Sequence, residues 1–189
     1  MDRPRRLIVG ISGASGVVYG IRMLGALRRL GVESHLVMSR AAETTLAVES
    51  DLDVAAVQAM ADVVHRIDDL TAGPASGSFR TLGMVVAPCS IRSLSEIATG
   101  VTSSLLTRAA DVTLKERRRL VLMVRETPLH AGHLRSMLAV TEMGAVVAPP
   151  LPAFYTRPTS LDQVIDHAIG RVLDLFGLDD GGTRRWGGG

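Results

Sequence analysis

The sequence LIVGISGASG at residues 7–16 joins a short apolar run to a glycine-rich turn. The apolar run, residues 7–12, is typical of a strand that is buried on both faces of a sheet. After the turn, residues 16–30 place apolar side chains at spacings of three and four, which predicts an amphipathic helix that ends near Gly31. This stretch therefore predicts a strand–turn–helix unit.

Apolar runs and helical patterns alternate along the rest of the chain. Further strands are predicted at residues 35–38, 82–87, 120–124 and 145–148, and further helices at residues 41–49, 90–99, 105–118 and 161–176. Each connection between parallel strands must return over one face of the sheet, so helices are expected on both faces. We therefore expect an α/β fold, a Rossmann-like or flavodoxin-like three-layer sandwich with a mostly parallel sheet.

The length of 189 residues is close to that of one average domain. No linker divides the chain, and residues 73–78 read as a polar loop, so residues 1–189 are expected to form a single domain. The C-terminal tail, about residues 178–189, sets Trp186 among glycines where no local core can hold it. We expect this tail to dock at a subunit interface, and a frayed tail is the alternative.

Composition narrows the functional class. Apolar residues make up 47% of the chain, and 21 Lys and Arg stand against 19 Asp and Glu. This near-balance of charge argues against a nucleic-acid-binding protein. The single cysteine, Cys89, excludes an internal disulfide framework and a cysteine-clustered zinc site. With charged first residues and no apolar run near the ~18 residues of a membrane span, neither a signal peptide nor a membrane segment is expected, and the predicted location is cytoplasmic.

Two turns are candidates for a ligand site, because ligands of parallel α/β sheets bind at the carboxyl ends of the strands. In residues 10–16, small side chains let the backbone approach a phosphate or a flat ring at a helix N-terminus. Residues 87–93 lead into the next predicted helix, and the hydroxyls and backbone amides at the start of this helix offer a second site for an anion. Two such turns suit a mononucleotide.

Other assignments of these turns are weaker. The first turn has the spacing G-x-x-G-x-x-G, and the second strand ends at Ser39-Arg40 without an acidic residue, so NAD is disfavoured. An NADP-dependent oxidoreductase, with Arg40 on the 2′-phosphate, stays open. Cys89 has an apolar setting and no histidine nearby in sequence, and we interpret it as a buried, unreactive thiol.

Several charged residues stand out in the second half of the chain. Arg108 and Lys115, the only lysine, are seven residues apart and share one helix face. Glu126 directly follows an apolar strand, beside Arg125, which favours a functional carboxylate over a surface one. Arg171 lies among apolar neighbours and needs a partner, either a phosphate or one of the nearby aspartates, Asp166 or Asp174. Residues 117–119, three arginines, are interpreted as a solvated helix end.

Six motifs lie in order along the chain between residues 13 and 155, within a stretch of recognisable sequence that runs from residue 7 to residue 186. They are GASG (13–16), APCS (87–90), RAAD (108–111), LKERR (114–118), RETPLH (125–130) and PAFY (152–155). With these motifs the sequence resembles the UbiX flavin prenyltransferases. The resemblance implies a single flavoprotein domain that joins the dimethylallyl group of dimethylallyl phosphate to N5 and then C6 of reduced FMN. The product, prenylated FMN, is the cofactor of UbiD-type decarboxylases, and the family forms homo-oligomeric dodecamers with sites shared between subunits.

The resemblance also implies roles for individual residues. FMN contacts fall on Gly13, Ala14, Ser15, Ser39, Ser90, Ile91, Arg92, Ser93 and Arg125. Prenyl-phosphate contacts fall on Tyr155 and Arg171, with Arg108, Lys115 and Glu126 closing the pocket. Arg92 stands where many members of the family have lysine, which keeps the charge.

The implied chemistry is coherent, because breaking an allylic C–O bond separates an allyl cation from a phosphate. Such a site needs cations on the phosphate, an acid to protonate it and a π face near the carbon. The arginines and Lys115 supply the charge, Glu126 the proton and Trp186 the π face. Ser15 is placed to assist proton movement near N5 of the flavin.

Two other classes are weighed against this one. FMN-dependent decarboxylases of the cysteine-decarboxylase class use a histidine in the first helix and a P-x-M-N motif, and this sequence has neither. A non-catalytic flavin carrier would not require Lys115, Glu126, Tyr155 and Arg171 together. Conventional prenyltransferases hold magnesium at D-D-x-x-D motifs, which the pairs at residues 68–69 and 179–180 do not complete. No metal is therefore expected.

Overall fold

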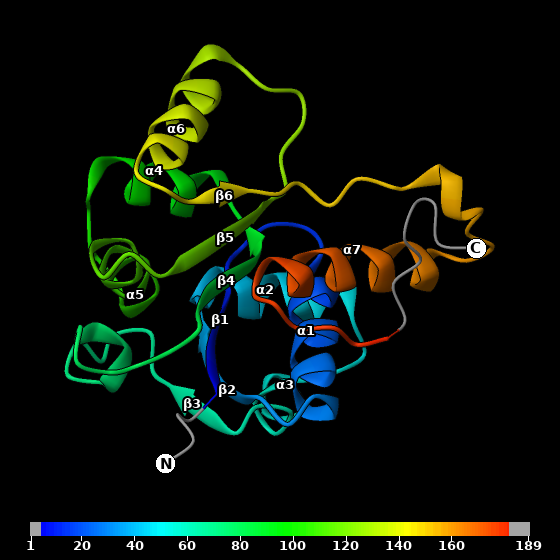
Figure 1. Cartoon of the computed structure of the whole chain (residues 1–189), viewed down its shortest axis with the longest axis horizontal. Coiled ribbons are helices and arrows are strands. Elements are labelled where there is room, and N and C mark those ends of the chain that lie inside the picture. Colours follow the sequence, from blue (N-terminus) through cyan, green and yellow to red (C-terminus); the bar gives the residue numbers. More distant parts are fainter. Residues whose placement is uncertain (1–4, 182–189) are drawn as a thin grey trace.

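The computed structural model describes residues 5–181, which contain a six-stranded sheet (Figure 1). Its strands are β1 (Arg6–Ile11), β2 (Glu33–Met38), β3 (Val63–His65), β4 (Gly83–Cys89), β5 (Arg119–Val124) and β6 (Val146–Val147). Their order across the sheet is β3-β2-β1-β4-β5-β6, and every neighbouring pair is parallel. Strand addition reverses direction between β1 and β4, as in doubly wound α/β folds.

Helices cover both faces of the sheet (Figure 1). They are α1 (Val17–Arg29), α2 (Arg40–Glu49), α3 (Val54–Gln58), α4 (Ile91–Thr99), α5 (Leu105–Lys115), α6 (Ala131–Glu142) and α7 (Leu161–Leu175), with short 3-10 helices η1 (Gly73–Ala75) and η2 (Phe154–Thr156). Buried side chains of α1, α2, α3 and α7 share one apolar cluster, and those of α4, α5 and α6 share the other. The expected three-layer α/β sandwich is confirmed.

Strand β4 explains why the central strands are continuous apolar runs. Val85 and Ala87 belong to the cluster under α1 and α7, whereas Met84 and Val86 belong to the cluster under α4 and α5. All four side chains have no exposed surface. Because side chains of a strand alternate between faces, a strand with a core on each side needs apolar residues at every position.

The predicted strands and helices are all present, although several of them begin or end at other residues than predicted. The helix predicted at residues 105–118 is wrong in its last turn: it ends at Lys115, since Glu116 is the C-cap and Arg117 has a φ of 56°. A left-handed residue cannot continue an α-helix. The short elements α3, β3, η1 and η2 were not predicted, and neither was α6, whose surface is mostly exposed.

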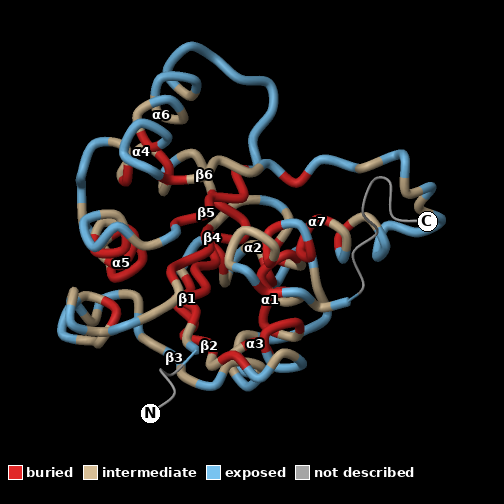
Figure 2. The backbone as a smooth tube through the Cα atoms, in the orientation of Figure 1, coloured by how far each residue is buried: buried red, intermediate tan, exposed pale blue. Residues whose placement is uncertain are grey.

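Helix α6 and the segment 148–160, here called the arm, project from the body of the fold (Figure 1). Both are largely exposed (Figure 2). On α6, Leu134 and Leu138 are exposed, and at the arm Leu151 and Phe154 are 74% and 78% exposed. Apolar surface of this kind on a water-exposed element is typical of an interaction surface.

None of the helices within residues 5–181 has the length and apolar character needed to cross a membrane. Trp186 and most of the tail lie outside the described residues. The docking of the tail therefore stays a prediction.

Candidate active site

The turns that follow β1 and β4 meet at the carboxyl edge of the sheet, where the strand order reverses. The Ser12 hydroxyl donates to the carbonyl of Pro88 at 2.9 Å and accepts from the amide of Ser90 at 2.7 Å. Ser12 itself is 1% exposed. A single buried hydroxyl thus ties the two turns together, as expected for two turns that contact one ligand.

A cavity of about 600 Å³ opens beside these turns. Its lining includes Gly13, Ser39, residues 90–93 and Glu126. The structure therefore brings together residues that the sequence analysis assigned to FMN and the predicted carboxylate Glu126. The volume lies within the range of small-molecule and cofactor sites.

Two helix N-termini bear on this cavity. Ser39 is the N-cap of α2, and its hydroxyl accepts from the amide of Ala42 at 3.1 Å. Ser90 is the N-cap of α4, and its hydroxyl accepts from the amide of Ser93 at 3.2 Å. Since helix N-termini carry partial positive charge and free amides, these two caps form a site for an anionic group such as a phosphate.

The N-terminus of α1 differs, because a carboxylate already occupies it. Its N-cap, Gly16, has no side chain, and Oε2 of Glu49 accepts from the amides of Gly16 and Val17 at 2.8 and 3.1 Å. Burial raises the pKa of Glu49, but hydrogen bonds from the Ser15 side chain and these amides outweigh it, so that the pKa is lowered. Of the two ligands left open for the first turn, a phosphate would have to compete with the Glu49 carboxylate for these amides, which favours the flat ring.

Glu49 also connects two residues that were predicted to contact FMN. The Ser15 side chain and the charge of Arg125 both help to lower its pKa. Arg125 in turn donates from Nε to the carbonyl of Ser15 at 3.2 Å. The sequence analysis missed Glu49, although the absence of a capping side chain at Gly16 was a signal that some other acceptor must reach this helix end.

The position of Gly13 shows how closely the first turn approaches α2. A Cβ added at Gly13 would lie 2.3 Å from the Cβ of Ala41. No larger residue fits without moving the backbone, which explains the glycine in the motif. The first turn and the N-terminus of α2 thus pack against each other, and together they line one side of the cavity.

Glu126 is at the rim of the cavity, one residue after Arg125. Its Oε1 accepts from the amide of Thr127 at 3.0 Å, which holds the carboxylate beside its own backbone.

Cys89, at the end of β4 near the same edge, is fully buried, and burial raises the pKa of its thiol to about 12. The expected burial of Cys89 is confirmed, and the raised pKa fits the interpretation of an unreactive thiol.

The two predicted phosphate ligands on α5 do not line this cavity. Arg108 donates to Asp111 at 2.8 Å and to the carbonyl of Ala75 at 3.3 Å. Lys115 pairs with Glu116 at the far end of the helix, and eleven residues at ~1.5 Å each place it roughly 16 Å from the end that borders the cavity. Arg108 faces Ala75 at the end of η1 and Lys115 faces Gly77, two residues further on, so the predicted shared face exists.

The other two predicted phosphate ligands lie on the arm and α7. The hydroxyl of Tyr155 is 3.3 Å from Nε2 of His167, and Arg171 donates to Asp174 at 2.7 Å. Arg171 and His167 line a second, smaller cavity of about 230 Å³ next to Pro149. Of the partners left open for Arg171, the structure has the aspartate Asp174. A single chain therefore does not gather the four residues around Glu126.

Among residues 5–181, no group of three or more His, Cys, Asp and Glu side chains is arranged to hold a metal ion.

Comparison with known proteins places this geometry in context. A model of the flavoprotein family matches residues 1–173. The flavin prenyltransferase UbiX of Escherichia coli (strain K12) is 60% identical over 175 residues, which cover 92% of this chain and 93% of that protein. A crystal structure of AnUbiX (PadA1) in complex with FMN and dimethylallyl pyrophosphate superposes with a TM-score of 0.97 at 53% identity, over 99% of this chain and 100% of that one.

A second solved structure adds information on assembly. The dodecameric FMN-dependent UbiX-like decarboxylase from Escherichia coli O157:H7 has a TM-score of 0.94 at 48% identity. The alignment covers 97% of this chain and 100% of that chain.

Proposed function

The chain belongs to the UbiX family of flavin prenyltransferases, and we propose that it transfers the dimethylallyl group of dimethylallyl phosphate to reduced FMN through the residues assigned below. The observation that carries these assignments is the cavity where Gly13, Ser39 and the turn 90–93 meet Glu126. It combines a place for an anionic flavin with an acid at its rim.

The N-termini of α2 and α4 hold the phosphate of FMN, through the amides that follow Ser39 and Ser90. The turn 13–15 lies along the flavin ring, and Arg125 is fixed beside it by its hydrogen bond to Ser15. When bound, the reduced flavin supplies N5 and C6 as the atoms that accept the prenyl group. Glu49, held ionised by its hydrogen bonds, orients the Ser15 hydroxyl for proton movement near N5.

The leaving phosphate needs positive charge and a proton. Arg108, Lys115 and Arg171 supply the charge, the Tyr155 hydroxyl donates a hydrogen bond, and Glu126 donates the proton. The indole of Trp186, beyond the described residues, provides a π face that stabilises the allyl cation.

We propose that the complete site is shared between copies of the chain in a homo-oligomer, and that this oligomer is a dodecamer like that of the similar Escherichia coli protein. Within one chain Tyr155 and Arg171 lie apart from the main cavity, next to exposed apolar side chains such as Phe154. A neighbouring copy that covers this apolar surface would bring the two residues to its own Glu126.

The product is prenylated FMN, and a UbiD-type decarboxylase is its proposed recipient. We propose the cytoplasm as the compartment, because a single buried cysteine suits reducing conditions.

The test of the activity is anaerobic incubation of the protein with reduced FMN and dimethylallyl phosphate, followed by mass spectrometry of the recovered flavin. The expected result is a flavin heavier by one prenyl group, with an altered absorbance spectrum. Bound flavin of unchanged mass would instead identify a flavin carrier.

The shared site has a separate test. Glu126→Gln and Arg171→Ala chains, each inactive alone, are co-expressed with different tags, and mixed oligomers are isolated. If sites are shared between subunits, the mixed oligomers regain prenyl transfer that neither parent has. If both residues act within one chain, the mixture stays as inactive as its parents.

A further inference from the structure

The edge of the sheet opposite the cavity, where the strands begin, is rich in arginine. Register pairs Leu7 with Gly83 and Gly83 with Arg119, so β1, β4 and β5 start side by side. Backbone hydrogen bonds Glu33 N to Arg5 O and Leu82 N to Arg6 O fix the preceding residues at the same edge. We name four exposed side chains here, Arg5, Arg80, Arg117 and Arg119, the arginine edge.

The positive charge of the arginine edge is not balanced within residues 5–181, where none of its four members has an ion pair or a side-chain hydrogen bond. Other basic residues of this edge are engaged: Arg6 pairs with Glu33 at 3.1 Å, and Lys115 pairs with Glu116. Arg118 donates to two backbone carbonyls, at 2.6 and 2.7 Å. The nearby carboxylates Glu33 and Glu116 thus already have basic partners, and the arginine edge keeps its charge for an outside partner.

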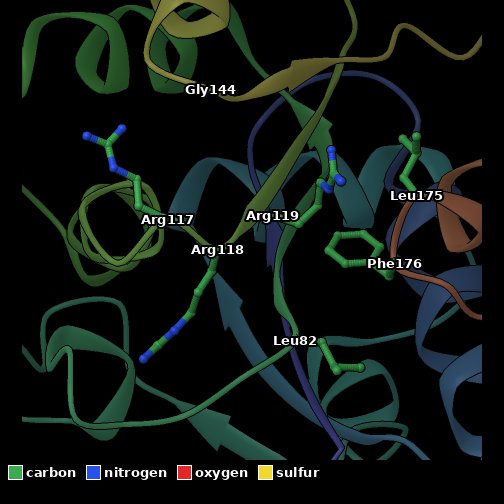
Figure 3. A pocket seen from close by; sticks show the side chains of 7 residues that line it. All are labelled: Leu82, Arg117, Arg118, Arg119, Gly144, Leu175 and Phe176. Atoms are coloured by element: carbon green, nitrogen blue, oxygen red, sulfur yellow. The ribbon is translucent and has the colours of Figure 1, made fainter.

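A hollow of about 590 Å³ runs along this edge between the starts of β4 and β5 and the end of α7. It is lined by Arg117, Arg118, Arg119 and the apolar residues Leu82, Leu175 and Phe176, among others. Figure 3 shows that the three guanidinium groups point in different directions, with Arg119 next to Phe176. No small anion can contact all three groups, and this spread fits a broad surface that carries several separate carboxylates.

We propose that the arginine edge and its hollow dock an acidic surface of a partner protein. Arginine beside leucine and phenylalanine is the composition of protein-interface hot spots. Guanidinium groups match carboxylates through two parallel hydrogen bonds, and they lose less hydration than ammonium groups. A second copy of the chain that presents the same edge would be repelled. Nucleic acid is disfavoured because the whole chain has a formal charge of only +2.

The arginine edge lies at the opposite edge of the sheet from the flavin cavity. The central strands have six or seven residues, so the arginine edge lies roughly 20 Å from the carboxyl edge that bears the cavity. A partner seated there leaves the mouth of the flavin cavity free. Charge at this distance steers association, and of the residues assigned to prenyl transfer only Lys115, which pairs with Glu116, lies at this edge.

The experiment compares two double variants of the full-length protein. Arg117→Glu with Arg119→Glu reverses the charge, and Arg117→Lys with Arg119→Lys keeps it at the same positions. The probe is a fluorescein-labelled peptide of glutamate and leucine, followed by fluorescence anisotropy at low and high salt. We expect the wild type to bind with a salt-sensitive Kd, the glutamate variant to bind at least about tenfold more weakly, and the lysine variant to retain most of the binding.

Three results would overturn the proposal. The first is peptide binding that is the same in the glutamate variant and the wild type. The second is equally tight and equally sensitive binding of labelled oligothymidylate, which would define a general polyanion surface. The third is a glutamate variant of altered oligomer size in size-exclusion chromatography, which would assign the edge to contacts between copies. Prenyl transfer by the glutamate variant is measured in parallel and is expected to be unchanged, so a failure of docking is distinct from a failure of the proposed function.

Discussion

The turns proposed to hold the flavin, here called the flavin turns, and the residues proposed to bind the phosphate differ in how far one chain brings them together. The flavin turns are fixed by buried or capping hydrogen bonds, such as those of Ser12, Ser39 and Ser90. The proposed phosphate ligands Arg108 and Arg171 each pair with an aspartate three residues further along the same helix. The fold of one chain therefore forms the first region, whereas one chain does not bring the members of the second region to Glu126.

The ion pairs of the second region are easily exchanged. Both side chains of the Arg108–Asp111 pair are exposed, at 36% and 41%, and exposed pairs contribute only about 0–1 kcal/mol. A phosphate dianion offers shorter, charge-assisted hydrogen bonds to a guanidinium group. If Arg108 binds the phosphate as proposed, exchanging Asp111 for the phosphate therefore costs little.

The strongest test of the division between the two regions is Glu126→Gln, because Glu126 lies where they should meet. The amide keeps the size of the side chain but cannot donate the proton to the leaving phosphate. We expect prenyl transfer to slow by about 100-fold or more, with FMN binding unchanged. Mass spectrometry of the flavin after timed anaerobic reactions measures the rate, and a wild-type rate would remove Glu126 from the mechanism.

Lys115→Arg tests whether Lys115, at the C-terminal end of α5, binds the phosphate of the substrate. A solvated helix end tolerates this change, whereas a closed phosphate pocket does not, because guanidinium is wider and planar and ammonium is compact. We expect the fold, the oligomer and the yellow FMN colour to persist. The half-saturating dimethylallyl phosphate concentration should rise, or turnover fall, by at least about tenfold, equivalent to ~1.4 kcal/mol.

The matched control for this variant is Arg117→Lys, two residues further along and exposed. It should leave the kinetics unchanged. If Lys115→Arg behaves like the control, Lys115 belongs to the solvated surface, and Arg108 and Arg171 remain as the phosphate ligands.

Glu49→Gln probes the flavin turns alone. The change removes the charge that caps α1, and we expect a loss of about 1 kcal/mol in the free energy of unfolding at neutral pH, as for other N-cap losses. Because the folded pKa of Glu49 lies below the value of 4.5 for the free group, its contribution is present above that value and is lost as the pH falls through the folded pKa.

Urea denaturation of the Glu49→Gln variant and of the wild type across this pH range measures the difference. The control is Glu142→Gln, at the exposed end of α6, which should leave the stability unchanged at each pH. A difference between Glu49→Gln and the wild type that does not shrink in acid would show that the charge of Glu49 is not what stabilises α1.

The sequence predicted the part of this architecture that depends on local patterns. Runs such as residues 7–12 and 120–124 are buried on both faces of the sheet. A strand in this position needs apolar residues at nearly every position, and this continuous apolar run is visible in the sequence. Short or exposed elements escaped prediction. Strand β3 has three residues, and the apolar positions of α6 include the exposed Leu134 and Leu138, so no buried stripe marks it as a core helix.

In the candidate site too, some residues could be predicted from local sequence patterns and others could not. The turn residues around Gly13 and Ser90 were predictable, because strand ends of a parallel sheet meet at one edge. Glu49 was not, since it acts across 33 residues of sequence through a hydrogen bond to Gly16. Nor does spacing reveal that Lys115 and Glu126 lie apart in one chain, because that separation follows from the direction in which α5 runs across the sheet.

Removal of divalent cations with EDTA is expected to have the smallest effect on prenyl transfer. It tests whether a metal ion or cationic side chains neutralise the charge of the leaving phosphate. A leaving phosphate is stabilised either by a divalent cation held on carboxylates or by cationic side chains. The second region offers Arg108, Lys115 and Arg171 for this purpose, and the aspartate pair at residues 68–69 lacks the third acid of a magnesium motif. Anaerobic turnover measured with and without EDTA should therefore agree, and added magnesium should change neither rate. A rate that falls with EDTA and returns with magnesium would mean that these cationic residues are not the groups that receive the phosphate charge.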